Sequence, residues 1–331
     1  MPASYTDDLR LAHLIADDAD ASSMSRFRAL DLRVDTKPDL TPVTDADRAV
    51  EEGVRRTLAR ARPRDSVLGE EMGESLGGGG RSRRWVVDPI DGTKNFVRGV
   101  PVWATLIALS VEDEVVVGVV SAPALNRRWW AVKDGGAWCG RSLQKAAACR
   151  VSDVSRLEDA SLSYSSLDGW DERGRLEDFL ALARTCWRTR AYGDFWSYVL
   201  VAEGAVDLAA EPELALHDMA ALDVIVREAG GRFTSLAGRD GPHGGNALAS
   251  NGMLHEVALG FLGAVDHDPE EPVEPGPAAG VPGAAQGPDL GPASDGRPSG
   301  EVFDMASRRR PATWQPGAGE PDPSPGVPPL G

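Results

Sequence analysis

Residues 85–96 read Trp85-Val86-Val87-Asp88-Pro89-Ile90-Asp91-Gly92-Thr93-Lys94-Asn95-Phe96, and this stretch decides which chemistry to look for. An apolar strand ends in two carboxylates three positions apart, and Pro89 fixes one dihedral of the turn between them. Carboxylate and backbone oxygens at this spacing suit Mg²⁺, which leaves room for phosphate oxygens. Gly92 and Thr93 then open a helix or helical turn, whose free N–H groups can receive a phosphate. If the stretch stood alone, an acidic turn with a helix cap would explain it better.

Other acidic residues fall where such a site needs further groups. Glu70 and Glu71 end a second apolar strand that begins at Val67. Because adjacent side chains leave a strand on opposite faces, only Glu70 is expected to face a metal, with Glu71 behind it. Asp47 lies three positions after a candidate N-cap threonine, and a capping acid is held still enough to orient another group. Asp218 opens a predicted helix, where an acid also complements the helix dipole.

Composition restricts the class of protein. The 331-residue chain has 42% hydrophobic and 26% charged residues, as in a globular protein, and a net charge of -16. This charge predicts repulsion of nucleic acids, anionic membranes and phosphorylated substrates, so phosphate chemistry needs a local cation. Cys139, Cys149 and Cys186 are too few and too scattered for a disulfide framework or a zinc site, which indicates reduced thiols. We find no signal peptide or membrane-length apolar run and expect a cytoplasmic protein.

The apolar pattern predicts layers of helix on sheet, an α/β (α+β) fold. Helices are expected at 7–31, with Leu9, Leu11, Leu14 and Ile15 on the apolar side, and at 44–61, 172–184, 195–204 and 218–229. Strands are expected at 67–68, 85–87, 103–111, 115–121, 128–133, 187–191, 205–210, 231–235 and 246–250, and Glu112-Asp113-Glu114 is expected to form an acidic hairpin turn between the strands at 103–111 and 115–121. The pattern changes near residue 150, which predicts an N-terminal metal-binding subdomain over 1–150 and a C-terminal subdomain over 151–264. Residues 265–331 carry more than half of the 24 prolines and are predicted to be a disordered tail.

Taken together, these motifs resemble the signatures of the inositol-monophosphatase superfamily. Asp-Pro-Ile-Asp-Gly-Thr-x-Asn-Phe over 88–96 is preceded by Gly-Glu-Glu at 69–71 and Thr-Pro-Val-Thr-x-x-Asp at 41–47, and is followed by Asp-x-Ala-Ala at 218–221. They stand in the family's order and at similar spacing, over about residues 5–264. The resemblance implies a layered α/β/α/β/α sandwich, a homodimer, and hydrolysis of phosphate monoesters that depends on two or three Mg²⁺ ions.

The resemblance also implies a role for each matched position. One Mg²⁺ would be held by Glu70, Asp88 and the Ile90 carbonyl, a second by Asp88, Asp91 and Asp218, and a weaker third would also touch Glu70. Asp47 and Thr93 would orient or deprotonate the attacking water, so they count with Glu70 as catalytic. The phosphate would be bound next to Asp91 by the backbone N–H groups of Gly92 and Thr93.

Two segments resemble the histidinol-phosphatase branch of that family. Lys94 stands where many inositol phosphatases have threonine, and residues 188–198 read Arg-Thr-Arg-Ala-Tyr-Gly-Asp-Phe-Trp-Ser-Tyr. In the family this region and the acid at Glu211 line the substrate pocket, so Lys94, Asp194 and Glu211 are the expected substrate contacts. Histidinol phosphate carries an ammonium and an imidazole, which carboxylates and aromatic faces can bind. Core packing of a helix explains Trp196 and Tyr198 equally well, and a helix N-cap explains Asp194 equally well.

The sequence therefore predicts a Mg²⁺-dependent histidinol-phosphatase, which converts L-histidinol phosphate and water to L-histidinol and phosphate in histidine biosynthesis. The second hypothesis is an inositol-1-phosphatase or a broad sugar-phosphate phosphatase. A third, a non-catalytic phosphate- or metal-binding protein, would not need the water-activating pair Asp47 and Thr93. His217 departs from the family, which usually has tryptophan before this aspartate, so the packing there is the part in doubt.

Overall fold

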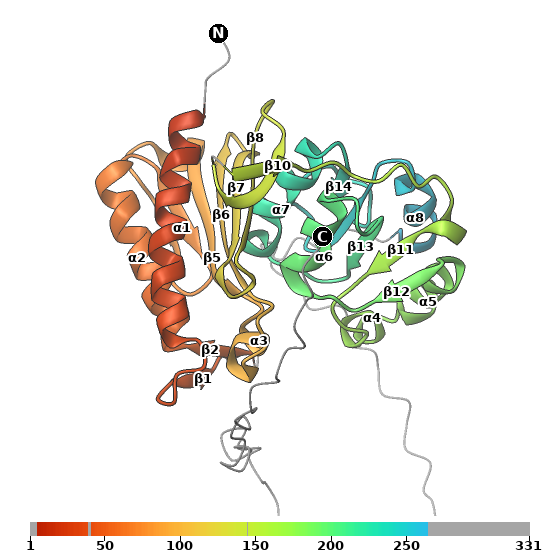
Figure 1. The fold of residues 1–331 in the computed structure, drawn as a ribbon, viewed down its shortest axis with the longest axis horizontal. Coiled ribbons are helices and arrows are strands. Elements are labelled where there is room, and N and C mark those ends of the chain that lie inside the picture. The colour runs from red at the N-terminus through yellow and green to blue at the C-terminus, as the bar shows by residue number, and fades with distance from the viewer. Residues whose placement is uncertain (1–4, 39–40, 144, 264–331) are drawn as a thin grey trace, which may run out of the picture. The chain divides into compact units, whose positions relative to one another are not determined.

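The computed structural model describes residues 5–38, 41–143 and 145–263 (Figure 1). The helices in these residues are α1 (Thr6–Arg26), α2 (Asp45–Ala61), α3 (Thr93–Arg98), α4 (Asp168–Glu172), α5 (Leu176–Thr185), α6 (Asp194–Ala202), α7 (Leu216–Glu228) and α8 (His255–Leu262). The strands are β1 (Val34–Thr36), β2 (Pro42–Thr44), β3 (Ser66–Gly69), β4 (Gly73–Ser75), β5 (Arg83–Asp91), β6 (Ala104–Val111), β7 (Glu114–Ala122), β8 (Arg127–Val132), β9 (Ala137–Ser142), β10 (Lys145–Ala148), β11 (Ser161–Ser163), β12 (Arg188–Arg190), β13 (Leu208–Glu211), β14 (Arg232–Thr234) and β15 (Ala247–Ser250).

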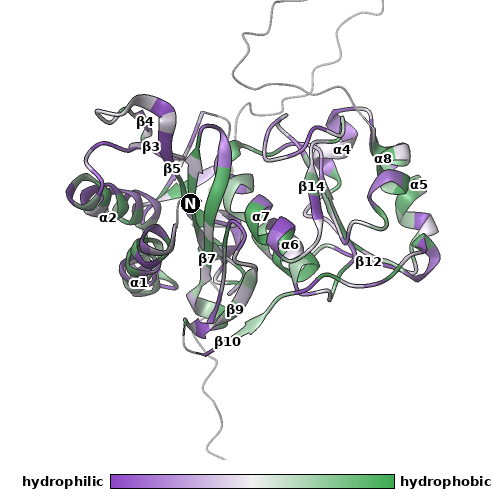
Figure 2. Ribbon diagram, turned by 90° about the horizontal axis from the view of Figure 1, so that it is seen from above, coloured by the Kyte–Doolittle hydropathy of each residue, from purple (hydrophilic) through white to green (hydrophobic). Residues whose placement is uncertain are grey.

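Helical layers alternate with two sheets, which confirms the predicted α/β/α/β/α sandwich. Helices α1 and α2 cover the outer face of an eight-stranded sheet, and α6 and α7 fill the space between that sheet and a five-stranded one (Figure 1). Helices α4, α5 and α8 pack on the outer face of the smaller sheet. Much of α7 is coloured hydrophobic in Figure 2, as expected for an element that is buried on more than one side.

These two sheets are both mixed, and β1 and β2 form a separate two-stranded antiparallel sheet. The larger has the order β10-β9-β8-β7-β6-β5-β3-β4, in which only β3 and β5 run parallel. Strands β5 to β10 form an antiparallel meander, and β4 pairs antiparallel with β3. The smaller has the order β12-β11-β13-β15-β14, with parallel pairs at β12-β11-β13 and antiparallel pairs beyond. The β6–β7 hairpin turns at Glu112 and Asp113, both with positive φ, as predicted for the acidic turn.

The first helix differs from its prediction at two points. It ends at Arg26 rather than near residue 31, because Phe27 is extended and Arg28 has a φ of 62°. Leu9, Leu11 and Ile15 are buried as expected, but Leu14 is 62% exposed. At about 100° per residue, Leu14 projects from the side of the helix opposite to the buried row.

The second half also departs from the predicted elements. Instead of one helix over 172–184, two helices are separated at Gly174, which has a φ of 64°. The sequence patterns missed the β9–β10 hairpin, β11 and α8. The short strands have few alternating residues, so their pairing depends on partners far away in the chain.

One apolar core joins the two sheets, because α7 packs against the larger sheet and also contacts β14 and β15. The larger sheet is built from residues 66–148 and the smaller from 161–250, so the division into subdomains near residue 150 stays a prediction. The predicted tail over 265–331 lies outside the described residues. Among the helices of the described residues, none is long and apolar enough to span a membrane.

Candidate active site

Three predicted ligands meet where the end of β5 approaches the start of α7. Oxygen atoms of Asp88, Asp91 and Asp218 lie within 4.8 Å of one another, and Asp88 also groups with Glu70 and His217 at the same separation. Asp88 is 2% exposed. Carboxylates this close repel each other in a desolvated site unless a cation lies between them.

A β-bulge explains how two aspartates three positions apart reach the same site. Asp88 is opposite Leu106 and Asp91 is opposite Ala104, so β5 has one more residue than β6 over this segment. On a regular strand, residues three apart point to opposite faces, and the extra residue changes that alternation. The turn is fixed by the Ile90 N–H, which donates to Asp88 Oδ1 at 3.0 Å.

Gly92 is required by both its backbone and its surroundings. Its φ is 83°, in the left-handed region, and it forms the N-cap of α3. A Cβ atom built there would lie 3.0 Å from the Val102 carbonyl oxygen and 3.2 Å from Asp194 Oδ2. The glycine therefore lets the metal-binding turn approach the Asp194 carboxylate closely.

Glu70 and Glu71 share a cation. Lys37 Nζ lies 2.6 Å from Glu70 Oε1 and 2.6 Å from Glu71 Oε1. Burial opposes the charge of Lys37, but the two carboxylates outweigh it and raise the pKa of the lysine. Burial raises the pKa of Glu71, against the hydrogen bond from Lys37. Only Glu70 groups with Asp88, which agrees with the expectation that Glu71 stands behind it.

Asp47 performs the predicted capping role and also touches Thr93. Its Oδ2 accepts from the Thr44 N–H at 2.8 Å, the return half of a capping box. Its Oδ1 lies 3.3 Å from Thr93 Oγ1, which is also 2.9 Å from the Ile90 carbonyl oxygen. A hydroxyl has one hydrogen, so Thr93 donates to one of these acceptors at a time. Burial raises the pKa of Asp47 to about 6.

His217 brings positive charge into the carboxylate cluster. Its Nδ1 lies 3.1 Å from Asp218 Oδ1 and 3.9 Å from Asp88 Oδ2. Burial disfavours the imidazolium, but these carboxylates outweigh it and raise the pKa of His217 to about 11. Burial likewise opposes the charge of Asp218, yet the hydrogen bond from His217 lowers its pKa overall. The residue that departs from the family pattern thus contacts the predicted ligands directly.

The donor set fits a hard divalent cation. Burial, followed by neighbouring negative charges, raises the pKa of Asp88 and of Asp91 well above the usual range of a carboxyl. A cation bound between them would stabilise the ionised forms. The donors are carboxylate oxygens and the Ile90 carbonyl, which keeps a lone pair beyond the one facing Thr93. Oxygen donors of this kind suit Mg²⁺.

Asp194 does not act as the helix cap that was considered for it. Helix α6 begins at Asp194 with Gly193 in the cap position, and no side chain caps it. The Asp194 carboxylate instead accepts from Asn95 Nδ2 at 3.0 Å, and its backbone has a φ of 48°. Burial, followed by the charge of Asp218, raises the pKa of Asp194 to about 6. A strained backbone at a half-buried acid beside a site is typical of functional positions.

Glu211 joins Asp194 through a serine. Ser165 Oγ donates to Glu211 Oε1 at 2.6 Å and accepts from the Asp194 N–H at 2.9 Å. Glu211 ends β13 and is 9% exposed. Burial raises its pKa to about 8, with the charges of Asp194 and Asp218 adding to the effect. Lys94 is exposed in the first turn of α3, and its charge acts on Asp194.

The aromatic residues of this region are mostly core. Phe195 and Tyr198 are 1% exposed and belong to the core between the sheets. Trp196 is half-buried and stacks edge-on with Tyr192, at a ring separation of 5.6 Å. Tyr192 and Trp196 therefore remain available to a ligand, whereas Phe195 and Tyr198 serve packing.

Three contributors were missed by sequence reasoning. Lys37 lies four positions before the quoted motif at 41–47, and Asn95 lies inside the motif at 88–96. Nothing in their spacing showed that Lys37 would bridge two glutamates or that Asn95 would hold Asp194. Ser165 lies in a run of serines with no motif, so only the fold identifies it.

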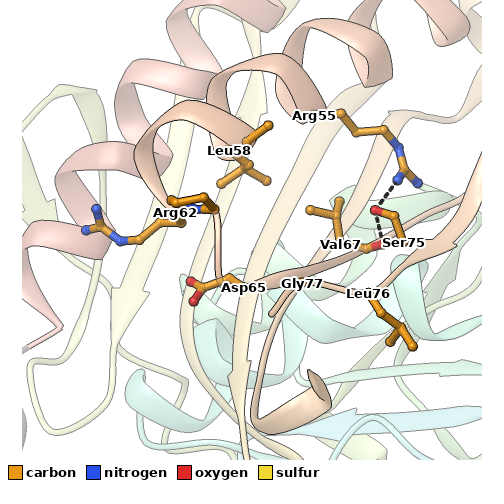
Figure 3. Close-up of a pocket in the computed structure, with 10 residues that line it drawn as sticks. Arg55, Leu58, Arg62, Asp65, Val67, Ser75, Leu76 and Gly77 are labelled. Atoms are coloured by element: carbon orange, nitrogen blue, oxygen red, sulfur yellow. Dashed lines mark hydrogen bonds between the residues drawn. The ribbon is translucent and has the colours of Figure 1, made fainter. Parts of the chain in front are cut away.

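A surface cavity of about 230 Å³ lies away from these residues, between the end of α2 and β3–β4 (Figure 3). It contains none of the clustered carboxylates. Its charged side chains already have partners: Arg55 with Glu51, Arg62 with Asp8, and Asp65 with Arg83. We therefore place the functional site at the carboxylate cluster.

Known proteins provide an independent comparison. Residues 9–264 match the Inositol monophosphatase family. The chain is 66% identical over 262 residues to a histidinol-phosphatase of Streptomyces coelicolor, covering 78% of this chain and 97% of that protein. It is 62% identical over 258 residues to a histidinol-phosphatase of Mycobacterium tuberculosis, covering 78% and 98%. A solved inositol monophosphatase from Zymomonas mobilis is 33% identical with a TM-score of 0.68, covering 78% and 99%. The chain belongs to the inositol monophosphatase family.

Proposed function

We propose that this protein is a histidinol-phosphatase that hydrolyses L-histidinol phosphate to L-histidinol and phosphate. The observation that carries the proposal is the line of acids that runs from the ligand cluster through the half-buried Asp194 to the buried Glu211, with Ser165 linking the last two. If the phosphate group of the substrate binds at the carboxylate cluster, its histidinol part would lie beside Asp194 and Glu211. The two histidinol-phosphatases at 66% and 62% identity support this choice of substrate.

The acid pair suits a cationic group. Burial keeps the pKa of Glu211 at about 8 and that of Asp194 at about 6. An ammonium or imidazolium group beside them would favour their ionised forms, so binding energy would come from charge-assisted hydrogen bonds. A neutral alcohol offers no such gain.

The proposed cofactor is Mg²⁺, two or three ions per site. Glu70, Asp88 and the Ile90 carbonyl would hold one ion, Asp88, Asp91 and Asp218 would hold another, and a third would contact Glu70. Such ions neutralise phosphate charge and make a bound water more acidic. The carboxylate positions and the raised pKa values of Asp88 and Asp91 support this arrangement.

Asp47 and Thr93 would prepare the attacking water. When Thr93 donates its hydrogen to Asp47, its oxygen can accept a hydrogen from water, which orients the water's lone pair. A carboxyl with a pKa of about 6 is ionised at neutral pH yet basic enough to assist proton removal. The N–H groups of Gly92 and Thr93 would bind the phosphate next to Asp91.

The alternative is an inositol-1-phosphatase. It is favoured by the likeness to the solved Zymomonas mobilis inositol monophosphatase and by the Ser165 hydroxyl, which could bond to sugar hydroxyls as well. A homodimer, implied by the family resemblance, and a cytoplasmic location, expected from the sequence, remain predictions.

A phosphate-release assay with Mg²⁺ tests the proposal. L-Histidinol phosphate should be hydrolysed with the highest kcat/KM among L-histidinol phosphate, inositol 1-phosphate and a simple aryl phosphate, and EDTA should abolish turnover. A higher kcat/KM for inositol 1-phosphate would replace the proposed substrate with the alternative.

A further inference from the structure

Two of the three cysteines lie together at the edge of the larger sheet. Cys139 is in β9, opposite Ala147 of β10 and Trp129 of β8. Cys149 directly follows β10, and its N–H donates to the Ala137 carbonyl at 2.8 Å, which continues the ladder by one residue. Because Ala147 and Cys149 are two positions apart, the two cysteines are diagonal neighbours on the same face of the hairpin.

The two thiols differ in their surroundings. Cys139 Sγ accepts from Arg127 Nη2 at 3.1 Å, and it is only half-buried. Cys149 is 9% exposed. A hydrogen bond from Cys149, helped by Arg127, lowers the pKa of Cys139, whereas the same bond and burial raise the pKa of Cys149. Cys139 is therefore the better nucleophile, and Cys149 is a neutral thiol beside it.

The position of the pair at the sheet edge permits a bond between them. Diagonal neighbours have Cα atoms about 7–8 Å apart, and a disulfide needs about 4.4–6.8 Å. Within the described residues, β10 pairs only with β9, and its register is irregular between Lys145 and Ala146. Because β10 is an edge strand, it can move toward β9 until the two Cα atoms reach the separation that a disulfide needs, and no other strand has to move with it.

We propose that Cys139 and Cys149 form a site of reversible oxidation by hydroperoxides. The Cys139 thiolate attacks a peroxide oxygen, the O–O bond breaks, and water or an alcohol leaves, which gives a sulfenic acid at Cys139. The Cys149 thiol then attacks that sulfur, the S–O bond breaks, and water leaves as the disulfide forms. Two electrons pass from the two thiols to the peroxide, and an external dithiol reverses the change.

Cys186 provides the internal control. It is half-buried, and burial raises its pKa to about 11, with no thiol or guanidinium beside it among the described contacts. An oxidant that reacts with any accessible thiol would modify Cys186 as well as Cys139, because both are half-buried. A reaction that depends on the hairpin geometry would spare it.

The test treats the full-length protein with one equivalent of hydrogen peroxide and maps the peptides by mass spectrometry without reduction. Wild type and Cys186→Ser should lose two hydrogen atoms and yield a Cys139–Cys149 cross-linked peptide. Cys149→Ser should stop at a sulfenic acid on Cys139 that dimedone traps, and Cys139→Ser should yield neither product.

The inference is overturned if dimedone labels Cys186 as fast as Cys139, or if wild type accumulates the sulfenic acid with no cross-link. Cys149 is buried, so its variant could fold poorly. Differential alkylation of the wild type before and after peroxide answers the same question, because Cys139 and Cys149 should become protected together and Cys186 should not. Equal protection of all three thiols would also refute the site.

Discussion

The backbone N–H of Phe195 donates a hydrogen bond of 2.7 Å to Asp91 Oδ2. This bond joins the start of α6 to the end of β5, so a proposed metal ligand is oriented by the residue next to a proposed substrate contact, Asp194. A substitution at Asp194 would therefore disturb both functions at once. Glu211, held by Ser165 and separate from this bond, is the cleaner position at which to test substrate recognition.

Glu211→Gln should weaken the binding of a cationic substrate selectively. A hydrogen bond to a charged group contributes about 1.5–3 kcal/mol, so kcat/KM for L-histidinol phosphate should fall by roughly 10- to 100-fold. An aryl phosphate without an ammonium group should be hydrolysed as before. Steady-state kinetics on both esters make the comparison, and an equal loss on both would remove the assignment of Glu211.

Asp88→Asn should abolish turnover while the protein stays folded. Asp88 groups with both sets of candidate ligands, and losing a ligand that two ions share costs several kcal/mol, which lowers kcat by roughly 1000-fold. In EDTA the variant should have a higher Tm than wild type, because it relieves repulsion within the cluster.

The matched control for Asp88→Asn is Asp159→Asn, which changes an exposed aspartate away from the cluster. It should leave both activity and Tm unchanged. Calorimetric titration with Mg²⁺ completes the comparison, and wild-type affinity in Asp88→Asn would contradict the proposed ligand set.

Without metal, the free energy of unfolding should fall as pH rises from the usual pKa of a glutamate to the raised pKa of Glu211. Its pKa is about 8 in the folded protein against a usual value of 4.5, so between these values the folded state holds a proton that the unfolded state has lost. The stabilising contribution is complete below pH 4.5 and disappears as pH passes 8. Urea unfolding in EDTA should show a stability advantage for Glu211→Gln that grows over this interval; an advantage independent of pH would contradict it.

Gly92→Ala should lower both stability and activity. An alanine at a φ of 83° costs about 1–2 kcal/mol in backbone strain alone, and its Cβ would press on the Val102 carbonyl and the Asp194 carboxylate. Thermal unfolding and kinetics measure the two effects. Gly78→Ala is the control, since a Cβ there meets no atom within 4 Å. Equal effects of the two variants would show that the glycine is not required by the turn.

Local signals in the sequence predicted much of the fold and the candidate site. The capping box of Thr44 and Asp47 fixed the start of α2, and the acidic turn fixed the β6–β7 hairpin. Both depend on residues within a few positions of each other, where a short pattern determines the geometry. The five layers and the family followed from the order of the motifs.

Other features depend on contacts that no local pattern records. The end of α1 depends on the backbone at Phe27 and Arg28, and the exposure of Leu14 depends on where the helix packs. Ser165 acquires its role only because β11 lies beside β13, which carries Glu211. The approach of Cys139 to Cys149 similarly requires the β9–β10 pairing, which short alternating segments did not predict.

The separation of the clustered carboxylates along the chain has a consequence during synthesis. Asp88 and Asp91 belong to β5, whereas Asp218 belongs to α7, more than a hundred residues later. A metal ion that needs all three aspartates cannot bind to a nascent chain until α7 has left the ribosome and packed against the larger sheet. An ion held by Asp88, Asp91 and Asp218 would therefore stabilise only chains in which α7 has already packed against the larger sheet, whereas the proposed site of Glu70, Asp88 and the Ile90 carbonyl needs no residue beyond β5.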